Sequence, residues 1–131
     1  MTTILNRLVL VIGLAVSPQG LLAKDATGIW RTEPTDQGYV EVELRACGPT
    51  LCGTILRARD LAGQEQAYEH TGKRMIWDMA DDGAGRWTNG RIWDPRNGRT
   101  FKSRMELDGT TLKVSGCVLG ICQTQTWRRV Q

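Results

Sequence analysis

Apolar and polar residues alternate along several short stretches of this chain, and turn-forming residues separate the stretches. Tyr39–Arg45 reads Tyr-Val-Glu-Val-Glu-Leu-Arg, and Thr100–Leu107 shows the same period of two. This period is typical of strands that bury one face. Gly48-Pro49, Asp81–Gly85 and Asp108-Gly109 provide turn chemistry between the stretches, because glycine takes positive φ and aspartate bonds to its local backbone. The pattern predicts a series of β-hairpins.

Eight short strands account for most of the chain after residue 27. They are expected at Gly28–Thr32, Tyr39–Arg45, Gly53–Arg57, Arg74–Met79, Arg86–Trp93, Thr100–Leu107, Thr111–Ser115 and Gln123–Val130. The polar, irregular segment Ala58–Gly72 is expected to be a long loop with at most one helical turn. A meander of eight strands closes most naturally into an up-and-down antiparallel barrel. The predicted fold class is all-β, with a single barrel domain over residues 24–131.

The first 23 residues follow a different pattern. Arg7 precedes the apolar run Leu8–Val16, Ser17-Pro18 follows it, and Ala23 is a small residue at a plausible cleavage point. The run is shorter than the roughly 20 apolar residues that span a bilayer. We predict a signal peptide over residues 1–23, a periplasmic or secreted mature protein, and no stable membrane span after cleavage. A retained anchor or a buried helix is the alternative.

Four cysteines form two pairs of equal spacing, Cys47 with Cys52 and Cys117 with Cys122. An even cysteine count in an exported chain indicates disulfides, and a four-residue loop places the two partners opposite each other across a hairpin. Opposed residues have Cα atoms about 4.5–5.5 Å apart, a separation that a disulfide accepts. Each bridge would clip a hairpin, with an outward Cys47 and Cys117, and stabilise by at most about 2 kcal/mol. A zinc site is the alternative, disfavoured by the compartment and by the single histidine, His70.

The scattered charges and the lack of an identifiable catalytic motif disfavour several classes of function. The formal net charge is +3, and removal of Arg7 with the signal peptide lowers it to +2. Because the basic residues are scattered, a nucleic-acid partner is disfavoured. His70 lies beside Glu69 with no identifiable nucleophile, so we predict no enzyme, no cofactor and no metal site. Glu41 and Glu43 share an outward face and are interpreted as solvated strand surface.

Strand alternation also selects the residues of the barrel lumen. The candidates for ligand contact are Val42, Leu44, Met75, Trp77, Met79, Phe101, Ser103, Met105, Gln123 and Gln125. The parity of the fourth strand is open, because either Met75, Trp77 and Met79 or Ile76 alone faces inward. An eight-stranded barrel is either filled by side chains or holds one small ligand. Apolar walls with a few polar groups predict a small lipophilic ligand. The alternative is a filled barrel whose outward Trp87 and Trp93 contact an envelope protein.

Two tryptophan motifs carry a resemblance to a known fold. Gly28-Ile29-Trp30 opens the first strand, and Trp127-Arg128-Arg129 lies in the last. This arrangement resembles that of the lipocalins, which have calycin-type barrels. The resemblance implies that Trp30 packs across one barrel end and that Arg128 or Arg129 stacks over it, a cation–π contact.

A more specific resemblance covers nearly all of residues 27–130. The chain is similar to a family of small exported bacterial proteins known as domain of unknown function 2147. The matching stretches are Gly28–Trp30, Cys47–Ile55, Gly90–Gly98, Leu112–Gly116 and Gln125–Arg129. The resemblance implies a lipocalin-like barrel and brings no established activity. The chain differs from most lipocalins because Gln131 follows the last strand directly, where they usually add a helix.

Overall fold

The computed structural model describes residue 13 and residues 25–131. The predicted signal peptide, residues 1–23, lies outside the described residues except for Gly13. No helix in the described part of the chain is long and apolar enough to cross a membrane.

Residues 25–131 form nine antiparallel strands. They are β1 (Gly28–Arg31), β2 (Tyr39–Cys47), β3 (Thr50–Arg59), β4 (Glu65–Gln66), β5 (Arg74–Gly83), β6 (Arg86–Asp94), β7 (Arg99–Asp108), β8 (Thr111–Val118) and β9 (Ile121–Arg129). Eight of them correspond to the predicted strands. The ninth, β4, is a two-residue strand on the edge of β3, and it lies in the loop where a helical turn was allowed. That loop contains turns and no helix.

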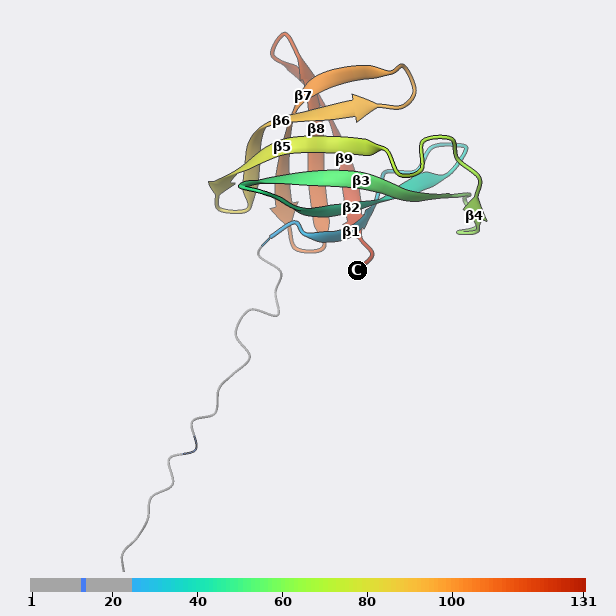
Figure 1. Ribbon diagram of the computed structural model, residues 1–131, viewed down its shortest axis with the longest axis horizontal. Coiled ribbons are helices and arrows are strands. Elements are labelled where there is room, and N and C mark those ends of the chain that lie inside the picture. Colours follow the sequence, from blue (N-terminus) through green and yellow to red (C-terminus); the bar gives the residue numbers. More distant parts are fainter. Residues whose placement is uncertain (1–12, 14–24) are drawn as a thin grey trace, which may run out of the picture.

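The eight longer strands close into a barrel, which confirms the predicted fold class. The sheet order is β2-β1-β9-β8-β7-β6-β5-β3, and pairing of β2 with β3 joins the two ends. Figure 1 shows β2, β3 and β5 crossing in front of β8 and β9, which run on the opposite wall. Closure satisfies the backbone groups that an open sheet would leave at its edges.

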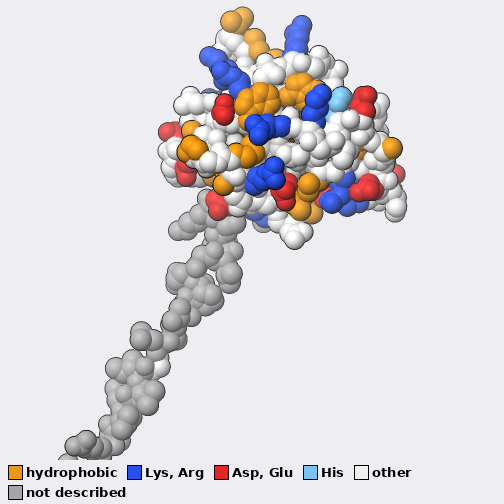
Figure 2. All heavy atoms as spheres, in the orientation of Figure 1, with side chains coloured by type: hydrophobic (Ala, Val, Ile, Leu, Met, Phe, Trp, Pro, Cys, Tyr) orange, Lys and Arg blue, Asp and Glu red, His pale blue; other side chains and the backbone are white. Residues whose placement is uncertain are grey.

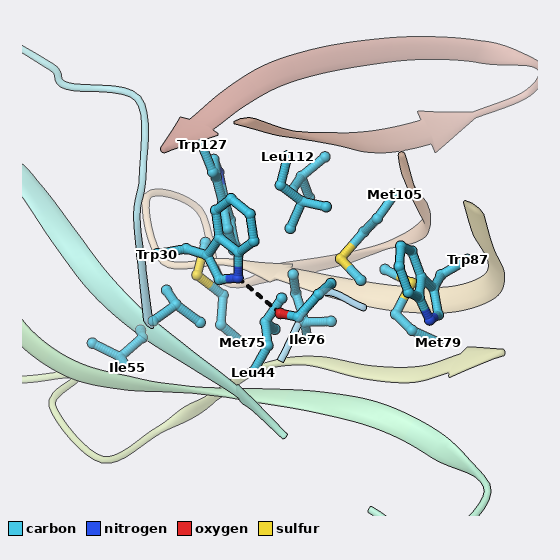
Figure 3. Packing of buried hydrophobic residues seen from close by; sticks show 13 residues of the cluster. Trp30, Leu44, Ile55, Met75, Ile76, Met79, Trp87, Met105, Leu112 and Trp127 are labelled. Carbon is cyan, nitrogen blue, oxygen red and sulfur yellow. Dashed lines mark hydrogen bonds between the residues drawn. The ribbon is translucent and has the colours of Figure 1, made fainter. Parts of the chain in front are cut away.

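One half of the interior is packed solid. Trp30 and Trp127 have no exposed surface, and Leu44, Ile76 and Met105 lie against them in one apolar cluster. Figure 3 shows these side chains pointing toward one another from opposite walls. Full burial of such side chains stabilises a fold by about 1.5–3 kcal/mol each. This packed half closes one end of the barrel.

Two local irregularities change the inward and outward positions on β5. A register shift around Met75 and a positive φ of 58° at Asp78 interrupt the regular alternation. As a result Met75 and Met79 are both buried together with Ile76. Trp77 pairs with Arg91 and lies half-exposed on the outer surface. Neither of the two parities considered for this strand is therefore right, and the assignment of Trp77 to the lumen is wrong.

A matching irregularity on β6 reverses the predicted orientation of Trp87. Asn89 has a φ of 61°, and the β6–β7 register shifts between Trp87 and Gly90. Trp87 is only 4% exposed and belongs to the core. Trp93 lies beyond the shift and stays half-exposed. The predicted outer pair of Trp87 and Trp93 does not exist.

The two cysteine pairs are disulfides, as predicted, but their hairpins differ. Cys117 lies directly opposite Cys122, with a Cα separation of 4.1 Å. Cys47 instead pairs with Thr50 across a two-residue turn, so its bridge to Cys52 runs diagonally over a Cα separation of 5.8 Å. Gly48 permits this tighter turn with a φ of 68°. The prediction that this first pair lies directly opposed is therefore wrong.

Candidate functional site

The second half of the barrel is hollow and forms an open cup. Its cavity has a volume of about 1350 Å³. Four segments surround the mouth: the β1–β2 loop, residues 66–68, the β6–β7 loop and the β8–β9 hairpin. In Figure 1 the β8–β9 hairpin extends beyond the other strands at the top of the barrel, and the β6–β7 loop lies at the upper right. Ligand pockets in proteins commonly measure about 300–1,000 Å³, so the cup is large enough for a small molecule.

The wall of the cup is mainly apolar. Its side chains come from all around the barrel: Val40, Ala58, Met75, Ile92, Phe101 and Val114. Gly116 on β8 adds a bare patch of backbone to this wall. A Cβ atom at Gly116 would come no closer than 3.5 Å to its nearest neighbour, Ile92. The absence of a side chain at this position keeps the cup open.

A few polar groups interrupt the apolar wall. Gln123 and Gln125 on β9 line the cup. The Oε1 atom of Gln125 accepts a hydrogen bond of 3.0 Å from the indole Nε1 of the buried Trp127. This bond fixes the side chain and leaves the amide NH₂ of Gln125 without a side-chain partner in residues 25–131.

Ser103 carries the one buried side-chain polar atom that has no hydrogen-bond partner within the described part of the chain. Its residue is 4% exposed and pairs with Gly116, whose backbone lines the cup. Leaving a buried hydroxyl unpaired costs about 1–3 kcal/mol. The hydroxyl is therefore an unpaired polar atom within the packed interior.

A charged cluster anchors the loop beside the mouth. Glu41 on β2 is 3% exposed and accepts hydrogen bonds from Arg57 and Arg59 on β3. The bond to Glu41 raises the pKa of Arg59 above its ordinary value. Arg57 also forms an ion pair of 3.2 Å with Glu65, and Arg59 donates to the carbonyl oxygen of Gly63. Glu41 faces outward but is covered by the arginines, so the prediction of a solvated carboxylate is wrong.

Aromatic side chains lie on another part of the rim. Tyr68, His70 and Trp93 stack edge to face, with ring centroids 5.2 and 5.0 Å apart. Burial raises the pKa of the Tyr68 hydroxyl, and the charges of Glu69 and Asp94 act in the same direction. Tyr68 lines the cup.

The β6–β7 turn has its own charged contact. Arg96 binds Asp94 through an ion pair of 2.8 Å. This hydrogen-bonded partner lowers the pKa of Asp94 below its ordinary value, against the opposing effect of burial. Both residues line the mouth.

At the closed end Arg129, and not Arg128, stacks on Trp30. The guanidinium carbon lies 4.3 Å from the centroid of the indole ring. The same guanidinium donates to the carbonyl oxygens of Thr27 and Asp25, over 2.7 and 3.0 Å. Trp30 Nε1 donates to the carbonyl oxygen of Ala26, the dashed bond in Figure 3. Arg129 thus ties the segment before β1 to the last strand.

The ten candidate lumen residues divide into three groups. Met75, Phe101, Gln123 and Gln125 line the cup. Val42, Leu44, Met79, Ser103 and Met105 are buried in the barrel interior and do not line it. Trp77 lies outside, in a shallow depression of about 350 Å³ with Lys73, Arg74 and Trp93. That any of these residues contacts a ligand stays a prediction.

Sequence reasoning missed most of the mouth. Alternation identifies the strand positions of the wall, such as Val114, but offers no signal for residues in irregular loops. Tyr68 and Gln66 lie in the long loop, and Thr35 and Gln37 lie in the β1–β2 connection. Over residue 13 and residues 25–131, no group of three or more His, Cys, Asp or Glu residues is placed to hold a metal ion.

Comparisons with known proteins agree with this architecture. A solved structure described as "Protein HP1028 from the human pathogen Helicobacter pylori belongs to the lipocalin family" superimposes with a TM-score of 0.64. It shares 16% sequence identity, and the match covers 80% of this chain and 82% of that one. This likeness shows a common fold. No curated protein matches the chain.

The sequence itself identifies the family. Residues 28–129, which include every strand of the barrel, match the family described as "Uncharacterized protein conserved in bacteria (DUF2147)". The chain therefore belongs to this bacterial family, and it has the lipocalin-like barrel that the resemblance implied.

Proposed function

We propose that this protein binds a small lipophilic molecule in its cup, outside the cytoplasm. The observation that carries the proposal is the hollow half of the barrel, a cavity of about 1350 Å³ with a mainly apolar wall. A packed interior would leave no room for a ligand. The two disulfides are compatible with an exported protein.

The polar groups of the cup favour an amphiphile over a pure hydrocarbon. The NH₂ group of Gln125 can donate a hydrogen bond to a ligand, and the amide of Gln123 on the same strand can donate or accept one. The apolar wall suits an aliphatic or aromatic body. Met75 adds adaptability, because a methionine side chain fills irregular space. The proposed ligand class is therefore a lipophile with one hydroxyl, carbonyl or carboxyl group.

Two observations count against the alternative, a filled barrel that contacts an envelope protein. The interior is filled only at one end, and Trp87 is buried in that end. Trp77 and Trp93 form the outer depression instead, where the Lys73 ammonium lies 4.3 Å from the Trp93 ring. We therefore favour the binding function.

Native mass spectrometry of the protein purified from its exported compartment, followed by lipid extraction, tests the proposal directly. A co-purified lipophile is the expected result. A second measurement uses N-phenyl-1-naphthylamine, a lipophilic dye whose fluorescence rises in apolar surroundings. We expect saturable binding of the dye with one site per barrel.

Two variants on the same strand separate the cup from the surface. Gly116→Phe places a ring in the open cup and should abolish dye binding. Lys113→Phe places the same ring at an exposed position of β8 and should leave dye binding unchanged. An empty protein in the mass spectrum, together with dye binding that Gly116→Phe does not alter, would contradict the proposed function.

A further inference from the structure

The tip of the β8–β9 hairpin is apolar and exposed. Val118 and Ile121 are paired across the hairpin and are 49% and 76% exposed, and Leu119 between them is 96% exposed. Figure 1 shows this hairpin extending past the rest of the barrel, and Figure 2 shows apolar side chains at the same place. We call these three residues the apolar tip. Three large apolar side chains together at a protruding turn are unusual for a surface that meets only water.

The backbone of the turn makes the leucine more unusual still. Leu119 and Gly120 have φ values of 52° and 79°, as in a two-residue hairpin turn of type I′. Asparagine, aspartate and glycine are the residues preferred there, and positive φ is uncommon for other residues. Neither turn preference nor burial in this chain explains Leu119. An apolar contact outside the chain would account for a leucine at this position.

Three cations lie on the outer face just below the apolar tip. Lys102 on β7 is flanked in register by Arg91 on β6 and by Cys117 on β8, and Arg104 is the next outward residue on β7. Like charges directly opposite each other, as with Arg91 and Lys102, are destabilising. None of the three forms an ion pair with a residue that the structure describes. Figure 2 shows Lys and Arg side chains on both sides of the apolar tip.

The apolar tip is fixed by a disulfide and lies at the mouth of the cup. Cys117–Cys122 joins the two strands one residue pair below Val118 and Ile121, so the apolar tip is held as a rigid hairpin. The apolar tip also lines one side of the mouth of the cup. A surface that takes up this tip would therefore lie next to the entrance of the cavity.

We propose that the apolar tip and the cations Arg91, Lys102 and Arg104 form a docking surface for an anionic phospholipid bilayer. The tip enters the interface between headgroups and acyl chains, and the cations contact the phosphates. Amphipathic surfaces of this kind bind membranes through apolar burial together with charge. Docking would bring the mouth of the cup to the bilayer, so its use in exchanging a lipophile rests on the proposed function. The docking itself does not require a ligand.

Flotation with phospholipid vesicles tests this docking. The mature chain is mixed with vesicles of phosphatidylcholine, with and without phosphatidylglycerol. We expect binding to the anionic vesicles, weakened by salt because surface charges are screened. Leu119→Ser should weaken binding about tenfold or more, since a buried leucine side chain is lost. Lys102→Glu should weaken it about fivefold or more, the effect of one cation near an anionic surface.

Matched variants away from the docking surface serve as controls. Leu61→Ser changes another exposed leucine, 64% exposed, in the loop before β4. Arg45→Glu reverses an exposed cation at the closed end of the barrel. Both should bind vesicles as the unchanged protein does. Gly116→Phe should also bind them fully, so a failure of docking and an empty cup can be told apart.

Three results would overturn the docking proposal. The first is equal binding to neutral and anionic vesicles, and the second is binding that neither Leu119→Ser nor Lys102→Glu weakens. The third comes from sedimentation of the protein alone. A dimer that Leu119→Ser dissociates would show that a second copy of this chain covers the apolar tip.

Discussion

At the scale of single residues, Arg129 shows how one side chain can hold a barrel end together. Its guanidinium stacks on Trp30 and donates to two carbonyl oxygens of the segment before β1. We expect Arg129→Met to lower the free energy of unfolding by about 2–3 kcal/mol, because a cation–π contact and charged hydrogen bonds are lost. Arg128→Met changes an exposed neighbour and should stay within about 0.5 kcal/mol. Urea unfolding followed by tryptophan fluorescence measures both, and equal losses would contradict the assigned role of Arg129.

Two buried serines offer a second comparison at this scale. The Ser103 hydroxyl has no partner in residues 25–131, whereas Ser115 shares a hydrogen bond of 2.8 Å with Thr124. Ser103→Ala should leave the melting temperature unchanged or raise it, because an unpaired buried hydroxyl is removed. Ser115→Ala should destabilise by about 1 kcal/mol. The melting temperatures of the two variants, measured on ligand-free protein, test both expectations. A clear destabilisation by Ser103→Ala would show that the Ser103 hydroxyl forms a hydrogen bond.

At the scale of strands and turns, alternation predicts where strands lie better than it predicts which way they face. The strand Thr100–Leu107 is regular, so Phe101, Ser103 and Met105 point inward as expected. On β5 and β6, Asp78 and Asn89 take positive φ. Asparagine and aspartate do so more often than other residues with a side chain, but the sequence does not mark which of them does so within a strand. Each such residue breaks the alternation between the side chains before it and those after it. A parity counted across Asp78 or Asn89 therefore assigns Trp77 and Trp87 to the wrong face.

A further prediction concerns the loop beside the mouth, which is anchored by side chains of the paired strands β2 and β3. Glu41 binds the two arginines that reach the loop, whereas Glu43, on the same face of β2, forms no ion pair within residues 25–131. We expect Glu41→Gln to destabilise by about 1–3 kcal/mol, since hydrogen bonds to charged groups are lost. Hydrogen exchange of residues 60–66 should quicken, because their anchor loosens. Glu43→Gln should change neither, and similar effects of the two variants would contradict the anchoring role of Glu41.

At the scale of the whole molecule, the barrel combines a packed half with a hollow half. The strand pattern and the lipocalin-like resemblance both predict a barrel, but the volume of its cavity depends on side chains that meet across it from distant strands. The sequence therefore left open whether the lumen is filled. Val42 and Leu44 lie below the cup and Val40 lines it, although all three alternate along one strand. The parity of a residue along its strand predicts whether its side chain faces inward. Its position along the barrel axis decides whether that side chain packs in the core or lines the cup.

Three glycines test this division of the interior with one kind of substitution. A Cβ at Gly90 would lie 2.4 Å from the Met79 sulfur, and a Cβ at Gly53 would lie 2.6 Å from a Leu44 methyl carbon. A Cβ at Gly116 would make only ordinary contacts, the nearest at 3.5 Å. Because overpacking of a filled core costs about 1–3 kcal/mol, Gly90→Ala and Gly53→Ala should destabilise by that amount.

Gly116→Ala should stay within about 0.5 kcal/mol of the unchanged protein or stabilise it, since alanine restricts the unfolded chain. Chemical unfolding of the three variants under one set of conditions measures the difference. Equal destabilisation by all three variants would mean that the half of the barrel assigned to the cup is packed as tightly as the closed half. If none of the three alanine substitutions destabilises the protein, the closed half of the barrel is loosely packed. Only the asymmetric result fits a barrel that is closed by its tryptophans at one end and hollow at the other.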